Sequence, residues 1–109
     1  MLIAGLIDNL FFSSKLREVA EQLGASVVVC RSADAVPADA ARVFVDLSAT
    51  AFDPIVEIAK LKATGSSCPI TAFFSHVQID TKERAEKAGA DEVLPRSVFT
   101  QRLTEIIGR

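Results

Sequence analysis

The stretch Arg42-Val43-Phe44-Val45-Asp46-Leu47-Ser48 decides the expected fold, because it carries a continuous apolar run that ends at an acid. Valine before and after the phenylalanine favours a strand. Such a run between segments of helical spacing is typical of a parallel strand that is covered on both faces. Ligands of open α/β sheets bind at the carboxyl ends of such strands, so Asp46 is the first candidate for a functional residue.

A second apolar run, residues 2–7, also ends at an acid, Asp8. The segment 11–23 has apolar residues at helical spacing and is followed by Gly24, a residue type that commonly ends helices. Residues 25–30 contain three consecutive valines and predict another strand. The chain therefore begins with a strand, a helix and a strand.

The connection 31–41 is too short for a full crossover helix with its loops. Pro37 interrupts any helix there that is longer than a turn or two. We expect only a stub of helix, at either residues 33–36 or residues 38–41. The second helix of the fold is thus predicted to be shortened.

The remaining chain repeats the alternation of strand and helix. Asp53 and Pro54 are typical of the cap and first position of a helix. The sequence predicts helices over 54–63, 80–88 and 98–107 and strands over 69–75 and 91–94. In the last helix we expect four residues to face the core: Val98, Leu103, Ile106 and Ile107.

Five strand-helix repeats predict a single α/β domain over residues 1–109, a doubly wound parallel sheet with right-handed crossovers. The flavodoxin-like strand order 2-1-3-4-5 is the expected one, with the first and third strands as central neighbours. Asp8 and Asp46 would then face each other at the carboxyl edge of the sheet.

Composition excludes several functional classes. The net charge of −2 leaves no basic stripe for nucleic acid, and no apolar run approaches the length of a membrane span. The apolar N-terminal run lacks the basic start of a signal peptide, so we expect a soluble, cytoplasmic protein. Cys30, Cys68 and His76 match neither a zinc site nor a disulfide framework; both cysteines are expected to be buried or half-buried, and His76 to lie in a surface loop.

Four segments together resemble the receiver domain of two-component response regulators, the CheY-like family, and the resemblance covers essentially the whole chain. The segment before the fifth strand is the most telling. The four segments are Ile7-Asp8-Asn9 with Lys15-Leu16-Arg17, Val45-Asp46-Leu47-Ser48, Ala88-Gly89-Ala90-Asp91, and Leu94-Pro95-Arg96-Ser97-Val98.

The resemblance implies roles for four residues. Asp46 matches the aspartate that accepts a phosphoryl group, and Asp8 matches the second of two acids that hold Mg²⁺ with it. Arg96 stands where receivers carry a lysine, and Ser75 lies one place after the position of a conserved hydroxyl. In receivers these two groups hold the transferred phosphoryl oxygens.

Several positions depart from the receiver pattern. Ile7 replaces the first metal-binding acid, Phe74 the hydroxyl residue, Ser97 the proline and Val93 the aromatic residue that rotates on activation. Arginine and lysine also differ in geometry, so Arg96 is not an equivalent cation. These departures predict at most a weak Mg²⁺ site and inefficient phosphotransfer, with Ser75 as a substitute hydroxyl.

Purely structural roles remain possible for the same residues. Asp46 could simply end a strand, and Asp8 could cap the following helix. Arg96 could form a permanent ion pair with either acid. In the pairs Phe11-Phe12 and Phe73-Phe74 we expect one member to face the core, and its neighbour to be available to a partner.

Two signalling functions follow, neither of them an enzyme. The first is a degenerate receiver, or pseudo-receiver, that docks to a protein partner through the face formed by residues 80–107. The second is a competent receiver that takes a phosphoryl group from a histidine kinase on Asp46. A small flavodoxin-like ligand-binding domain is a weaker alternative, because no glycine-rich phosphate loop follows the first strand.

Overall fold

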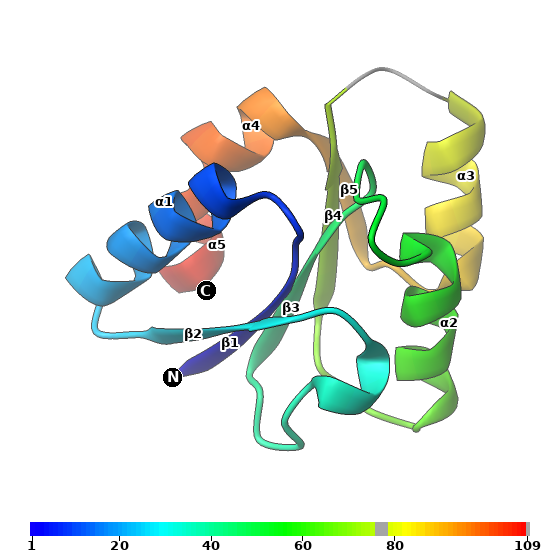
Figure 1. Ribbon diagram of the computed structural model, residues 1–109, viewed down its shortest axis with the longest axis horizontal. Coiled ribbons are helices and arrows are strands. Elements are labelled where there is room, and N and C mark those ends of the chain that lie inside the picture. Colours follow the sequence, from blue (N-terminus) through cyan, green and yellow to red (C-terminus); the bar gives the residue numbers. More distant parts are fainter. Residues whose placement is uncertain (76–78, 109) are drawn as a thin grey trace.

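The computed structural model describes residues 1–75 and 79–108 and arranges five parallel strands in one sheet (Figure 1). The strand order is β2-β1-β3-β4-β5, so the predicted order and the central pairing of the first and third strands are confirmed. The strands are β1 Leu2–Leu6, β2 Ser26–Cys30, β3 Arg42–Asp46, β4 Ile70–Phe74 and β5 Glu92–Pro95.

Helices cover both faces of the sheet (Figure 1). One face carries α1, α4 and α5, and the other carries α2 and α3. Because successive side chains of a strand point to opposite faces, Phe44 of β3 packs toward α1, whereas Val43 and Val45 pack toward α2. The helices are α1 Leu10–Gln22, α2 Pro54–Ala63, α3 Ile79–Ala88, α4 Arg96–Gln101 and α5 Leu103–Gly108.

The connection between β2 and β3 contains a single 3₁₀ turn, η1, at Ala33–Ala35. The predicted stub at residues 33–36 is therefore confirmed as a shorter turn, and the alternative at 38–41 is wrong because that stretch is not helical. The buried carboxylate of Glu57, on α2, accepts the Ala33 N–H at 2.9 Å. This bond fixes the turn against α2.

The predicted helix 98–107 is wrong in its bounds, since it is divided at Arg102 into α4 and α5. The first of these begins at Arg96, directly after β5. Phe99 is fully buried, whereas Val98, predicted to face the core, is only half-buried. The burial predicted for Leu103, Ile106 and Ile107 is confirmed.

Gly89 ends α3 with a φ of +126°, a backbone conformation that other residues rarely adopt. A side chain there would also meet the Cγ atom of Lys62, whose stem lies across the glycine. Lys62 pairs with Asp91 at 3.6 Å, and the same Asp91 carboxylate oxygen accepts the Ile70 N–H at 2.8 Å. The glycine and the acid of the segment 88–91 therefore have structural roles. Gly89 leaves room for the Lys62 stem, and Asp91 connects the end of α3 to α2 and β4.

The two cysteines are free, with Cys30 buried and Cys68 half-buried, as predicted. The prediction for His76 falls outside the described residues. Within residues 1–75 and 79–108, no helix has the length and apolar character required to cross a membrane.

Candidate functional site

Asp46 ends β3 at the carboxyl edge of the sheet, and only 3% of it is exposed. Its Oδ1 atom accepts the Ser48 N–H at 2.8 Å, a turn in which the side chain replaces a backbone carbonyl. Burial raises the pKa of the Asp46 carboxyl above its ordinary value of 3.8; the Ser48 bond and the Arg96 charge act against this, and the Asp8 charge adds to it. Asp46 is thus an acid whose ionised form is disfavoured by its surroundings.

Asp8 lies just after β1 and binds the loop that follows β3. Its Oδ2 atom accepts the N–H groups of Thr50 at 2.8 Å and Ala51 at 3.0 Å. These bonds, the Ala51 one first, lower the pKa of Asp8 below 3.8. Asn9, not Asp8, caps α1 by accepting the Phe12 N–H at 3.1 Å, so the alternative that Asp8 is the helix cap is wrong.

Arg96 begins α4, and its guanidinium carbon lies 4.4 Å from the centroid of the Phe12 ring (α1). Among the described residues it forms no ion pair within 4.0 Å, so the alternative of a permanent pair with Asp46 or Asp8 is wrong. A cation over an aromatic face is attracted by the negative face of the ring. Arg96 therefore acts on Asp46 only through its charge, which lowers the pKa of that acid.

The ring beneath Arg96 belongs to a cluster of four buried phenylalanines. Phe12 lies 4.8 Å from Phe73 between ring centroids, and Phe73 stacks on Phe99 at 4.5 Å. Phe99 in turn meets the edge of Phe44 at 5.1 Å. Such contacts at close-packed positions hold the Phe12 ring in one place beneath the cation.

The pair Phe11-Phe12 divides as the sequence predicts, but in the pair Phe73-Phe74 both rings pack against the core, on opposite faces of the sheet. Phe12 and Phe73 face the core, whereas 91% of Phe11 is exposed. Phe74 is half-buried and packs toward α2 and α3. Phe74 thus places a ring, not a hydroxyl, at the end of β4.

Ser75 is brought to the site by Ser48, a residue that the sequence analysis did not single out. The Ser48 hydroxyl donates to the Ser75 hydroxyl at 3.2 Å and accepts the Ser75 N–H at 3.2 Å. The same Ser48 donates its own N–H to Asp46. The signal in the sequence is a serine two residues after a strand-ending aspartate, the pattern of an Asx turn.

The residues at this edge fit a weak magnesium site and no more. Asp8 and Asp46 each keep one carboxylate oxygen outside the bonds described above. Ile7, in the place of a third acid, is 1% exposed and supplies no ligand. Mg²⁺ often uses one or two carboxylates with water, yet the described part of the chain gathers no three metal-binding side chains.

Comparison with known proteins finds no matching family model and no matching curated protein. Solved structures do match. A response regulator receiver protein from Pseudoalteromonas atlantica is 18% identical, with a TM-score of 0.79 over 99% of this chain and 98% of that chain. The chemotaxis protein CheY4 of Vibrio cholerae is 12% identical, with a TM-score of 0.83 over 99% and 96%.

A third similar structure is a response regulator protein from Burkholderia pseudomallei that contains a phosphorylated aspartic acid, a calcium ion and citrate. It is 21% identical, with a TM-score of 0.77 over 98% of this chain and 71% of that chain. Likeness at these identities shows the fold: the chain has the CheY-like, flavodoxin-like fold of receiver domains.

Proposed function

We propose that the chain is a receiver-like module of two-component signalling that docks to a protein partner without phosphorylation of Asp46. The fold supports the general class, since receiver domains match the chain over almost its whole length. The proposal gives the chain no catalytic activity of its own, and no nucleic-acid or membrane partner.

The observation that carries this proposal is the position of Arg96. A phosphoryl group on Asp46 needs a cation and donors aimed at its oxygens. Arg96 instead lies on Phe12 at 4.4 Å, over a ring that the aromatic cluster fixes in place. Phe74 offers no hydroxyl, and a single donor aimed at a developing charge is worth about 3–4 kcal/mol in well-studied enzymes.

The state of Asp46 supports the same conclusion. Phosphorylation and metal binding both use the ionised carboxylate, so any preference for the neutral acid acts against them. Burial raises the pKa of Asp46, and the nearby Asp8 charge raises it further. Its Oδ1 atom accepts the Ser48 N–H at 2.8 Å, so a metal ion or phosphoryl group at that oxygen would share it with this bond. A weak Mg²⁺ site does little to offset these effects.

Exposed apolar side chains flank the carboxyl edge and give the proposed docking module its anchors. Phe11 at the start of α1 is 91% exposed, and Ile79 at the start of α3 is 69% exposed. Ile79 is the first residue of α3 and directly precedes the face of residues 80–107 on which we place the docking. Aromatic residues are enriched among those that contribute most to protein interfaces.

The test is incubation with Mg²⁺ and either acetyl phosphate or beryllofluoride, read by intact mass and by amide NMR. We expect no phosphoryl mass gain and no beryllofluoride-dependent shifts that reach α3. A phosphoryl gain that is lost in Asp46→Asn would overturn the proposal in favour of a competent receiver that serves a histidine kinase. Arg96→Lys combined with Phe74→Thr is the positive control, since it should raise phosphorylation.

Docking is tested by using the protein as bait in an extract of its source cells. A specific partner should be recovered equally by the wild type and by Asp46→Asn, and it should be lost with Phe11→Asp or Ile79→Asp. The control is Leu23→Asp, since Leu23 is 43% exposed at the opposite end of α1. Partner loss in Asp46→Asn would contradict a phosphorylation-independent role.

A further inference from the structure

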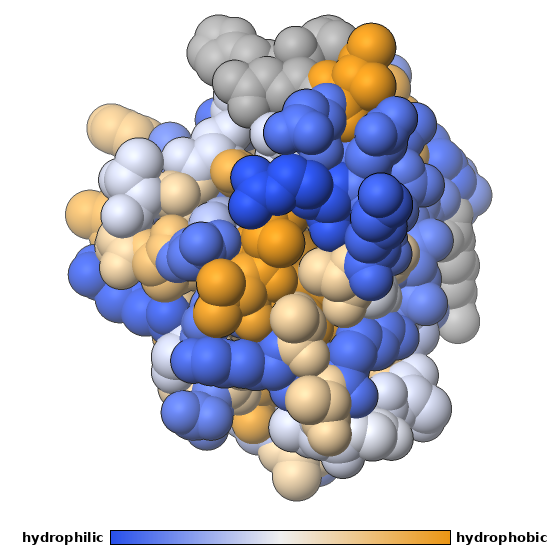
Figure 2. All heavy atoms as spheres, turned by 90° about the vertical axis from the view of Figure 1, so that its right-hand side faces the viewer, coloured by the Kyte–Doolittle hydropathy of each residue, from blue (hydrophilic) through white to orange (hydrophobic). Residues whose placement is uncertain are grey.

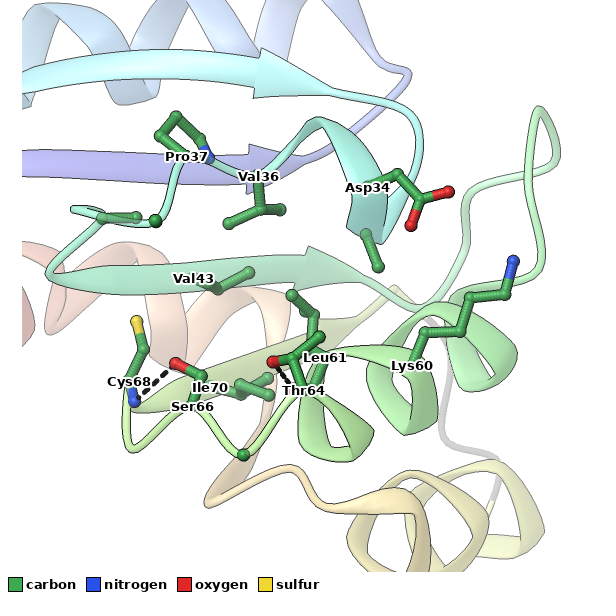
Figure 3. A pocket seen from close by; sticks show the side chains of 14 residues that line it. Asp34, Val36, Pro37, Val43, Lys60, Leu61, Thr64, Ser66, Cys68 and Ile70 are labelled. Atoms are coloured by element: carbon green, nitrogen blue, oxygen red, sulfur yellow. Dashed lines mark hydrogen bonds between the residues drawn. The ribbon is translucent and has the colours of Figure 1, made fainter.

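A pocket of about 520 Å³ lies away from the carboxyl-edge site, against the shortened β2–β3 connection (Figure 3). Its floor is formed by β3 and β4 through Val43 and Ile70, and the second half of α2 forms one wall through Leu61. The connection from residue 33 to residue 40 forms the opposite wall, where Val36 and Pro37 lie.

The pocket exists because this connection lacks a helix. The other three crossovers carry α1, α2 and α3, of 13, 10 and 10 residues, whereas η1 has 3 residues. Side chains of a full helix would fill the space above the sheet, since interiors are close-packed. Here a short loop crosses from β2 over β1 to β3 and leaves that space open.

Apolar side chains form most of the lining, with Thr64 among them and further polar side chains toward the two ends (Figure 3). Asp34 and Lys60 lie at one end, and Ser66 and Cys68 at the other. Figure 2 shows the side of the molecule that carries α2 and α3. Hydrophobic residues gather in the middle of this side, among mainly hydrophilic ones. Water gains few hydrogen bonds over such a floor, which favours an apolar occupant.

The polar groups of the lining are largely engaged within the protein. The Thr64 hydroxyl donates to the Leu61 carbonyl at 2.6 Å, and the Ser66 hydroxyl accepts the Cys68 N–H at 3.1 Å. The Lys60 ammonium pairs with Glu57 at 3.5 Å. Among the described residues, the pocket therefore has no buried, unpaired charge that would bind a charged ligand.

We propose that this pocket binds a small, neutral, mainly apolar molecule, whose polar group, if it carries one, lies at the end between Asp34 and Lys60. The volume falls within the roughly 300–1,000 Å³ of small-molecule sites. The walls are preformed, because Glu57 on α2 holds the opposite wall through the Ala33 N–H. This site is independent of Asp46 and of the proposed docking.

The first test is an NMR titration of the whole chain with 4-phenyl-1-butanol, a neutral probe with an apolar body. The methyl signals of Val43, Leu61 and Ile70 should shift together and saturate. Ala40→Phe should weaken binding by about tenfold or more, because Ala40 is half-buried in the lining and a ring there fills the space. Ala41→Phe, an exposed neighbour outside the lining, is the matched control and should bind as the wild type does.

Cys68 provides a second, independent readout. Its half-buried thiol lies at one end of the pocket, so saturating probe should slow its alkylation, while buried Cys30 stays unreactive throughout. Shifts confined to other surfaces, or equal affinity of a folded Ala40→Phe variant, would overturn the proposal. So would unchanged alkylation of Cys68 at probe concentrations that saturate the NMR shifts.

Discussion

The guanidinium carbon of Arg96 lies 4.4 Å from the centroid of the Phe12 ring, beside the carboxyl edge of the sheet. In the described part of the chain, the contact directs Arg96, whose charge acts on Asp46, toward an aromatic face instead of a carboxylate. The charge of Arg96 still reaches Asp46 and lowers its pKa. The position of the Arg96 side chain and the effect of its charge on the pKa of Asp46 can therefore be tested separately.

We predict that Arg96→Gln lowers stability only slightly and raises the pKa of Asp46 further. A partly exposed cation–aromatic contact contributes about 0.5–1 kcal/mol, which urea unfolding measures. The pKa change follows from loss of a positive charge near the acid, and carboxyl-carbon NMR titration of Asp46 reports it. Arg84→Gln, on the exposed surface of α3, is the control and should change neither quantity. An unchanged Asp46 titration would show that Arg96 does not act on this acid.

We predict that Asp46→Asn stabilises the protein at neutral pH. The folded pKa of Asp46 is raised above 3.8, so its contribution to stability is fully present below the unfolded pKa and is lost as pH rises through the folded value. The amide carries no charge to desolvate and keeps an acceptor for the Ser48 N–H.

Thermal unfolding between pH 3 and 7 tests this prediction, with the pH values set on both sides of the ordinary pKa of 3.8. The stability that Asp46→Asn gains over the wild type should be absent at the lowest pH values and should appear as the pH rises. Asp39→Asn, in the exposed β2–β3 connection, should show no such gain. A variant less stable than the wild type at neutral pH would mean that the charge of Asp46 stabilises the fold.

The central strands were predictable because each is a short apolar run that ends at or near an acid, as at Asp8 and Asp46. The shortened second helix followed from Pro37 and the length of its connection. Both signals are local, and both act through the backbone. They were therefore visible without knowledge of tertiary contacts.

The position of Arg96 over Phe12 and the pairing of Ser48 with Ser75 were not predictable, because both depend on contacts between segments far apart in the chain. Nothing near Arg96 in sequence indicates that Phe12 lies beneath it. Phe99 is a different case. It stands four residues before Leu103, the helical spacing that puts both on one face, and the signal was overlooked in favour of Val98.

We predict that Phe99→Ala destabilises the fold strongly. Phe99 is fully buried and contacts Phe12, Phe44 and Phe73. Truncation of a buried phenylalanine costs about 3–5 kcal/mol, because it leaves a cavity. Val98→Ala, at the half-buried neighbour, should cost less than about 1.5 kcal/mol in urea unfolding. Equal losses in the two variants would contradict the assignment of Phe99 to the core.

We predict that Glu57→Ala loosens the β2–β3 connection, whereas Glu57→Gln does not. The alanine variant leaves the buried Ala33 N–H without its acceptor, a loss of about 1–3 kcal/mol. Glutamine keeps a carbonyl oxygen at the same place and loses only the pairing with Lys60. Amide exchange of Ala33 should accelerate in the alanine variant alone. Similar exchange in both variants would mean that the carboxylate is not what fixes η1.

We predict that Asp8→Ala frees the loop after β3 and lowers the pKa of Asp46. The folded pKa of Asp8 is below 3.8, so the stability that Asp8 contributes is present above that value and is lost as pH falls through the folded pKa. Removing an acceptor of two N–H groups at this partly exposed site should cost about 1 kcal/mol at pH 7. Amide exchange of Thr50 and Ala51 measures the loop, and carboxyl NMR measures Asp46. If the loop loosens while the Asp46 titration stays fixed, Asp8 holds the loop but does not act on the buried acid through its charge.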